Sequence, residues 1–304
     1  MDSTSKGPGK GWQRKGTRPW IWFDGRFVRA DEPCFTLDDW GDAIQSGVRV
    51  GACAYGTQVR MLRPYYELFM AQIEQAGLPV PANVTEASID QACTDLLNKN
   101  RVFRRADIEL QGFLQYRHDG LGILQATTGL AIMAEPCDMR FYEDLPRGLL
   151  LEVYQGARVA LNGLCGIDWL GSPLTWQAQR FASLLGQKSC ILLNEQNRVA
   201  GALGRTLYAR IGREVYTPPI TEGAIYDPIR DIIPDLVRSC QLGVVREAPM
   251  PLTQLHAADT VFLASTAHGI ERVLGIKMQR YDSRGTEQLT AALNHLYFPE
   301  QLTP

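Results

Sequence analysis

The feature that most limits how this chain can fold is a series of short apolar runs joined by turn signals. Helical patterns occur between these runs at irregular intervals. The opening stretch WIWFDGRFVRADEPCFTL has two alternating runs separated by Asp24-Gly25, a dipeptide typical of a two-residue hairpin. Many later strand patterns also follow one another through short turns. A wound parallel sheet needs strands that alternate strictly with helices. The order of elements therefore predicts an α+β fold.

The expected elements form two successive groups. The first contains the hairpin, helical patterns in RPYYELFMAQIEQAGL and NVTEASIDQACTDLLNKN, and strands in ADIELQGFLQYR and GLAIMAEP. The second starts with a strand in DLPRGLLLEVYQGARVAL and continues through several strands, a helix in DPIRDIIPDLVRSCQLG and a closing helix. We predict an N-terminal subdomain over residues 19–140, a C-terminal subdomain over residues 141–304, and a pocket between them.

Composition excludes several classes of function. The chain of 304 residues has a net charge of -2, which gives no overall attraction for nucleic acid or membranes, and no apolar run approaches a membrane span. Residues 1–18 are basic and glycine-rich without the apolar stretch of a signal peptide, so we expect a disordered tail. The seven scattered cysteines favour reduced thiols in a cytoplasmic protein. Common metal, phosphate-loop and hydrolase spacings are absent, so we expect no metal site.

A few polar residues are candidates for a site. His118, beside Arg117, and His268, in LASTAHGI, each end a strand that opens into a glycine-containing loop. For either histidine a purely structural role is the simpler alternative. Arg49 lies among small and apolar residues in GDAIQSGVRVGAC, where an unpaired charge would be costly. It therefore needs either a bound anion or a structural carboxylate, and the sequence leaves both open.

Six stretches of the sequence are informative because of the order in which they occur: WFDGRFV, WGDAIQSGVR, GQKSCILLNEQNRV, TLYARIGREVYTPP, IRDIIPDL and LHAADTVFLASTAHGIERV. In this order they resemble the fold-type IV family of pyridoxal-phosphate enzymes, which includes branched-chain aminotransferases, D-amino-acid transaminases and aminodeoxychorismate lyases. The second stretch, for example, is similar to the family's Gly-Asp-x-x-Phe-Glu-x-x-Arg segment. The resemblance runs from about residue 19 to the C-terminus. It implies a two-subdomain α+β fold of the fold-type IV aminotransferase kind and a homodimer.

The resemblance also implies roles for single residues. Arg49 and Thr266 would hold the phosphate of the cofactor, and the loop that contains Ala267 and His268 would receive the carboxylate of the substrate. Arg117 and His118 are added as candidates for substrate binding because they end a strand beside a glycine loop.

Three positions depart from the family pattern. Asp168 stands where the Schiff-base lysine is expected, Gly201 stands where a glutamate would pair with the pyridine nitrogen, and Pro228 has no N–H for the phosphate loop. An aspartate cannot form an imine, and no lysine lies between Glu109 and Gln187. Lys188 and Lys277 lie in or near later strands.

These departures lead to a prediction of function. We expect an enzyme that works without a cofactor on a small anionic substrate, as a lyase, isomerase, cyclase or hydrolase, with Asp168 and His268 as its acid–base pair. An imidazole at His268 is expected to titrate near neutral pH. Arg49 and Thr266 would remain as an anion site. The alternatives are a pyridoxal-phosphate enzyme, with its lysine elsewhere or its cofactor held without an imine, and a non-catalytic partner of an active relative.

Overall fold

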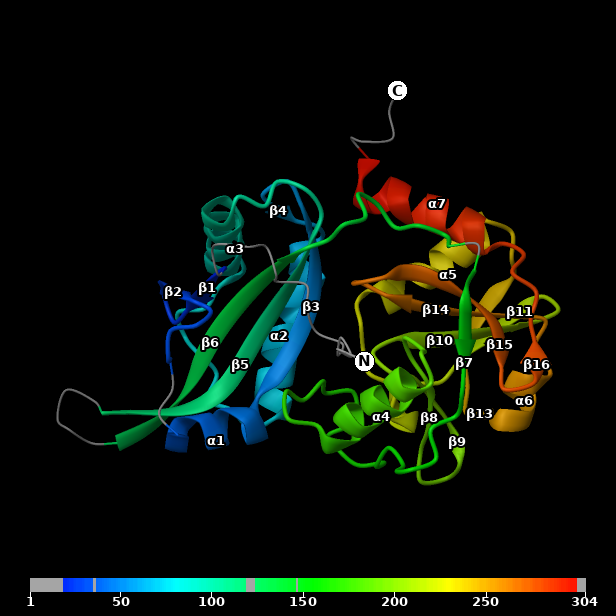
Figure 1. The fold of residues 1–304 in the computed structure, drawn as a ribbon, viewed down its shortest axis with the longest axis horizontal. Helices are drawn as coiled ribbons and strands as arrows, with labels where there is room; N and C mark the ends of the chain where they lie inside the picture. Colours follow the sequence, from blue (N-terminus) through cyan, green and yellow to red (C-terminus); the bar gives the residue numbers. More distant parts are fainter. Residues whose placement is uncertain (1–18, 35–36, 119–123, 146, 300–304) are drawn as a thin grey trace, which may run out of the picture.

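The structure is a computed structural model that describes residues 19–34, 37–118, 124–145 and 147–299. The tail predicted over residues 1–18 lies outside the described residues. Helices and sheets form two lobes that lie side by side (Figure 1). Each lobe has its own main sheet, one built from strands before residue 137 and the other from strands after residue 148.

The first lobe consists of one antiparallel sheet covered on one face by two helices. Its strands are joined in the order β2-β1-β6-β5-β3-β4. Its elements are β1 (Trp20–Phe23), β2 (Arg26–Arg29), α1 (Leu37–Ser46), β3 (Val48–Tyr55), β4 (Gln58–Val59), α2 (Leu62–Gln75), α3 (Glu86–Asn100), β5 (Ala106–His118) and β6 (Leu124–Pro136).

The second lobe contains a seven-stranded sheet, in the order β12-β11-β10-β14-β15-β16 with β7 paired to β15, and a three-stranded sheet in the order β13-β9-β8. Its strands are β7 (Leu149–Leu151), β8 (Ile191–Leu193), β9 (Arg198–Ala202), β10 (Thr206–Ile211), β11 (Glu214–Thr217), β12 (Val244–Glu247), β13 (Met250–Pro251), β14 (Thr260–Ser265), β15 (Gly269–Ile276) and β16 (Gln279–Arg280). Its helices are α4 (Pro173–Leu184), the 3-10 turn η1 (Ile220–Glu222), α5 (Ile229–Ser239), α6 (Leu252–His256) and α7 (Thr286–Tyr297).

Local sequence signals explain where several of these elements begin and turn. Asp24 and Gly25 both have positive φ in the tight turn between β1 and β2, as a two-residue hairpin requires. Thr85 caps α3, where its hydroxyl accepts the N–H of Ser88 and the Ser88 hydroxyl accepts the N–H of Thr85. Ser172 caps α4, and Pro173 occupies the first turn of that helix.

The two faces of the first sheet differ sharply, and this difference positions the site. One face carries Val48, Val50 and Ile108, which are buried against α2 and α3 in an apolar core. Side chains alternate between faces along a strand, so the intervening residues point the other way. Those residues are largely polar, and they face the second lobe.

Backbone hydrogen bonds join the two lobes near the start of β3. Residues 168–170 pair with the beginning of β3, where the N–H of Arg49 donates to the carbonyl of Asp168 and the N–H of Leu170 donates to the carbonyl of Gly47. Among the residues that the structure describes, no helix is long and apolar enough to cross a membrane.

Candidate functional site

The polar face of the first sheet forms one wall of the candidate site. The register of β3, β5 and β6 places three rows of residues on it: Cys53, Asp107 and Glu135; Gly51, Glu109 and Met133; and Arg49, Gln111 and Ala131. Directly opposed residues lie close enough for their side chains to interact. Gly51 is exposed in mid-strand, and a β-carbon built on it would meet nothing within 4 Å. The face therefore opens into free space above its middle row.

Arg49 ends in an ion pair with the residue at the expected lysine position. Its Nε lies 2.9 Å from Oδ2 of Asp168, and the two side chains are 31% and 24% exposed. Burial acts to lower the pKa of Arg49, but the charges of Asp168 and Glu109 outweigh it and raise that pKa overall. Of the two alternatives that the sequence left open, this structure shows the carboxylate partner.

Thr266 has a different carboxylate for its partner. Its N–H donates to Oδ2 of Asp227 at 2.7 Å, and its hydroxyl donates to Oδ1 of the same residue at 2.5 Å. The first free N–H of α5, on Ile229, also donates to Asp227. Burial raises the pKa of this carboxyl, and its three donors oppose that shift.

Arg49 and Thr266 thus each have an acid of their own. The shared anion site that we predicted for them stays a prediction, and the structure supplies no contact in its support. Little in the sequence pointed to Asp227, because an aspartate before a proline at a helix start is common in loops.

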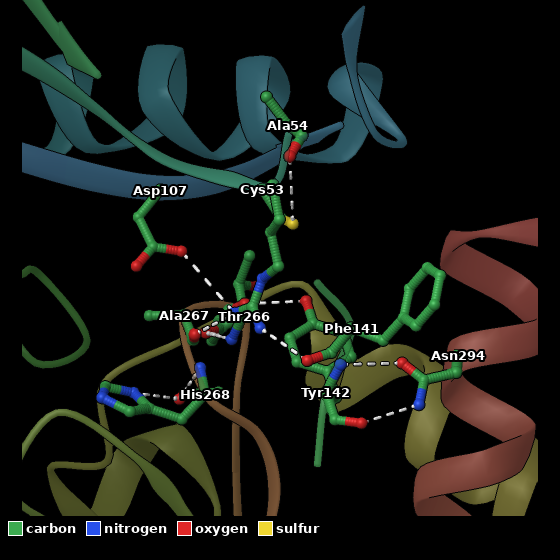
Figure 2. Close-up of polar contacts among 12 residues, drawn as sticks. Cys53, Ala54, Asp107, Phe141, Tyr142, Thr266, Ala267, His268 and Asn294 are labelled. Atoms are coloured by element: carbon green, nitrogen blue, oxygen red, sulfur yellow. Dashed lines mark hydrogen bonds and ion pairs between the residues drawn. The ribbon is translucent and has the colours of Figure 1, made fainter. Parts of the chain in front are cut away.

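His268 lies in the loop between β14 and β15, on the second lobe (Figure 2). Its Nδ1 is 3.2 Å from the hydroxyl of Ser265. Burial, and after it the positive charge of Arg205, lowers its pKa to about 4. The expectation of an imidazole that titrates near neutral pH is therefore wrong, because the sequence does not reveal burial beside guanidinium groups.

The predicted acid–base pair is not joined in the structure. Among the described residues no hydrogen bond or ion pair connects the side chains of Asp168 and His268, which lie against β3 and in the β14–β15 loop respectively. Their assignment as one catalytic pair stays a prediction.

Arg117 lies far from this loop. It forms an ion pair with Asp24, 2.7 Å between Nη2 and Oδ2, at the distal end of β5. The other end of β5 follows Arg105, which contacts Ala267, so roughly 40 Å of extended strand separates the two arginines. The side chain of His118, at the end of the same strand, lies outside the described residues. Arg117 therefore does not join the other candidates within this chain.

Arg105 and Asp107 are site residues that the sequence patterns did not single out, and Figure 2 shows Asp107 above the loop that contains Ala267 and His268. The Arg105 side chain is fully buried, donates to the carbonyls of Ala267 and Phe141, and lies with its guanidinium 4.3 Å from the centre of the Tyr142 ring. Asp107 has one oxygen 3.7 Å from Arg105, and burial raises its pKa to about 6. Two acids at alternate positions in ADIEL could have signalled a polar sheet face, whereas nothing marked Arg105.

The residues present do not fit a pyridoxal phosphate linked to a lysine. All three described lysines are exposed: Lys99 packs against the Trp20 ring, Lys188 precedes β8, and Lys277 forms the β15–β16 turn. Gly201, on β9, offers no carboxylate to a ring nitrogen. The donors of Thr266 and Ile229, which would suit a phosphate, are already taken by Asp227.

Comparisons with known proteins show what this chain is similar to. Residues 130–276 match the family model of amino-transferase class IV. A putative branched-chain-amino-acid aminotransferase of Methanocaldococcus jannaschii is 23% identical over 281 residues, which cover 91% of this chain and 94% of the relative.

Solved structures agree in fold. The branched-chain amino acid aminotransferase from Escherichia coli superposes with a TM-score of 0.78 at 22% identity, over 93% of this chain and 96% of that protein. The enzyme from Thermobaculum terrenum, described in its PLP-form, gives a TM-score of 0.78 at 20% identity, over 92% and 94% of the two chains. The resemblance to the fold-type IV family and its α+β fold is confirmed.

The comparisons contradict two of our predictions. The relatives are aminotransferases, and one of the matched structures holds pyridoxal phosphate. Our expectation of a cofactor-independent lyase, isomerase, cyclase or hydrolase is therefore wrong, as is the expectation that no cofactor is used. Both rested on departures from the family pattern at single positions, namely Asp168, Gly201 and Pro228, whereas the similarity over the whole fold favours the aminotransferase alternative.

Proposed function

We propose that this chain, which matches the class IV aminotransferase model over residues 130–276 and shares the fold of such enzymes, is an enzyme of the aminotransferase or lyase type whose substrate is a small molecule with an amino group. One observation carries this proposal, namely the excess of carboxylates on the polar face of β3, β5 and β6. Asp107, Glu109 and Glu135 lie there on neighbouring strands. Carboxylates that are not matched by cations favour a substrate with an ammonium group.

The cations near this face do not cancel those charges. Arg49 is paired with Asp168, and the buried guanidinium of Arg105 donates to two backbone carbonyls and lies 3.7 Å from Asp107. Two cations thus face four acids, namely Asp168, Asp107, Glu109 and Glu135. Glu109 lies directly opposite Gly51, where the space above the sheet is open. An ammonium group placed over Gly51 would reach Glu109 first, with Asp107 in the next row.

Pyridoxal phosphate supplies an electron sink in aminotransferase and lyase chemistry. The described residues do not fit its lysine-linked form, so the roles proposed for this chain do not depend on that linkage. The chain's own residues bind the amino group of the substrate and exclude anions from the carboxylate face.

Three matched ligands test the proposal: pentylamine, pentanoate and norvaline, each added to the purified chain with and without pyridoxal phosphate. We expect pentylamine and norvaline to raise the melting temperature and pentanoate to leave it unchanged. Glu109→Gln, which keeps the shape of the side chain and removes its charge, should reduce that preference. Glu67→Gln, an exposed acid on α2, is the control. Equal binding of pentanoate and pentylamine, or an undiminished preference in the Glu109 variant, would contradict the proposal.

Catalysis is tested with the same samples. With pyridoxal phosphate and 2-oxoglutarate present, we expect norvaline to lose its amino group at a rate that depends on chain concentration. A chain that binds amines but shows no turnover under any cofactor condition would favour the second candidate, a non-catalytic partner of an active relative. The exposed positions of all three described lysines favour that candidate.

The finer parts of our sequence predictions also remain proposals. We propose a homodimer located in the cytoplasm and a subdomain boundary near residue 140. The exposed apolar side chains of Trp176 and Leu184, at one-face spacing along α4, support an interface on that helix. Sedimentation velocity with Leu184→Glu measures this directly, since a dimer through α4 should dissociate.

A further inference from the structure

A groove separate from the carboxylate face lies where three helices meet. It encloses about 830 Å³ between the first turn of α2, the outer face of α5 and the last turns of α7. Tyr65 and Tyr297 form part of its wall, and their hydroxyls hydrogen-bond to each other at 2.6 Å. This volume is within the range of sites that hold small organic molecules.

The walls of the groove are mostly apolar. They include side chains from all three helices: Met61, Pro64, Ile232, Leu236 and Leu296. Met61 is 38% exposed and Leu296 is 45% exposed. An apolar ligand would remove part of this surface from water, which is favourable at roughly 25 cal/mol per Å².

The charged side chains that line the edge of the groove are acidic. Asp231 and Asp235 are four residues apart on α5, so they lie on one face of that helix, and both line the groove. No lysine or arginine is among the described residues that line it, and His295 on α7 is the one basic side chain there. The groove therefore complements a cation that carries an apolar body.

Both carboxylates have existing contacts that a ligand can share or replace. Asp231 accepts a hydrogen bond from the hydroxyl of Tyr226 through one oxygen. Asp235 pairs with Arg238 at 3.0 Å, but both side chains are at least 70% exposed, and such surface pairs contribute little. A primary ammonium group has three donors and can bind both carboxylates.

We propose that this groove binds a small amphiphilic amine, with its apolar body against Met61, Ile232 and Leu296 and its ammonium group between Asp231 and Asp235. The proposal concerns a second site, distinct from the carboxylate face over Gly51. The occupant is a free small molecule with one positive charge and a chain of several carbons.

Titration calorimetry with the full chain tests the site, with octylamine as the probe and octanol and octanoate as matched controls. We expect octylamine to bind more tightly than octanol, and octanoate to bind least. Asp231→Asn combined with Asp235→Asn should weaken octylamine binding about tenfold and leave octanol binding unchanged, since roughly 1.4 kcal/mol of charge attraction is removed. Leu296→Gln should weaken both octylamine and octanol.

Two control variants separate this groove from the other acidic surfaces of the chain. Asp138→Asn with Glu143→Gln removes two exposed acids outside the groove and should change nothing. Glu109→Gln removes the acid of the proposed substrate face, where an alkylamine also binds, and should leave intact the octylamine site that depends on Asp231 and Asp235, so that failure of either proposal can be recognised alone.

Three results would overturn the proposal. Octanoate could bind as well as octylamine, or the variant of Asp231 and Asp235 could bind octylamine undiminished. Alternatively, sedimentation velocity could show a dimer that Leu296→Glu dissociates and that octylamine competes with, which would make a second copy of the chain the occupant.

Discussion

The behaviour of His268 depends on its surroundings more than on its residue type. The sequence placed it correctly in the loop after a buried strand, but it could not show how deeply the ring is buried or that Arg205 lies near it. Both effects disfavour a second proton and lower its pKa to about 4. At neutral pH this imidazole is therefore neutral and cannot donate a proton as an imidazolium.

We expect the ring resonances of His268 in an NMR titration to have a midpoint near pH 4 and to stay unchanged between pH 6 and 7. His268→Gln identifies the signal, which should vanish in that variant. Because the folded pKa is lower than that of the unfolded chain, the contribution of His268 to stability is complete above about pH 6.5 and is lost as the pH falls toward 4. A midpoint at 6.5 or above would show that the ring is solvated.

Asp107 should make the stability of the fold depend on pH in the direction opposite to that of His268. Its pKa rises from 3.8 to about 6 on folding, so its contribution to the free energy of unfolding is complete below about pH 4 and is lost as the pH rises through 6. The side chain is 40% exposed, so we discount the full shift to about 1 kcal/mol.

Urea denaturation of wild type and Asp107→Asn at pH 4 and pH 6.5 measures that loss. All other titrating groups are common to both proteins, so the change in their difference reports on Asp107. We expect the wild type to lose about 1 kcal/mol relative to the variant between the two pH values. A constant difference would mean that the carboxyl is fully hydrated.

At the scale of elements, turns and helix caps could be predicted from the sequence, whereas contacts between distant segments could not. The Asp24-Gly25 turn and the Thr85 cap could be read from the sequence because each depends on residues only a few positions apart. The pairing of residues 168–170 with β3 could not, because it joins segments more than one hundred residues apart. The identity of the partner of Arg49 depended on that pairing.

The role of Thr85 as the cap of α3 can be tested by its contribution to stability. Thr85→Ala removes the acceptor for the N–H of Ser88 and should lower the free energy of unfolding by about 1 kcal/mol. Thr85→Ser retains the hydroxyl and should cost only a few tenths of a kcal/mol. Urea denaturation of the three proteins measures both values. Equal losses in the two variants would assign the effect to the methyl group and contradict the capping role.

At the scale of the whole molecule, the site depends on contacts between lobes that no local pattern announces. Arg105 contacts Ala267, and Tyr65 contacts Thr266, each across a long interval of sequence. Nothing in the local sequence around these residues marks them as contacts between lobes. The sequence therefore indicated which residue types were available, and the resemblance indicated the fold. The hydrogen-bond partners of those residues follow only from the packing of one lobe on the other.

Tyr65 provides the strongest test of that packing. Its hydroxyl lies 2.8 Å from the hydroxyl of Thr266 and 2.6 Å from that of Tyr297, so it joins α2 of the first lobe to the β14–β15 loop and to α7 of the second. Tyr65→Phe leaves the Tyr297 hydroxyl buried without this partner, which typically costs about 1–3 kcal/mol. Tyr208→Phe is the matched control, because the buried Tyr208 hydroxyl has no hydrogen-bond partner in the described part of the chain.

We expect urea denaturation to show a loss of about 1–3 kcal/mol for Tyr65→Phe and a change near zero for Tyr208→Phe. Adding Tyr297→Phe to the Tyr65 variant should cost less than Tyr297→Phe costs alone, because the bond between the two hydroxyls can be lost only once. Additive losses would show that the two hydroxyls act independently. Equal losses in the Tyr65 and Tyr208 variants would show that ring packing alone joins the lobes at α2.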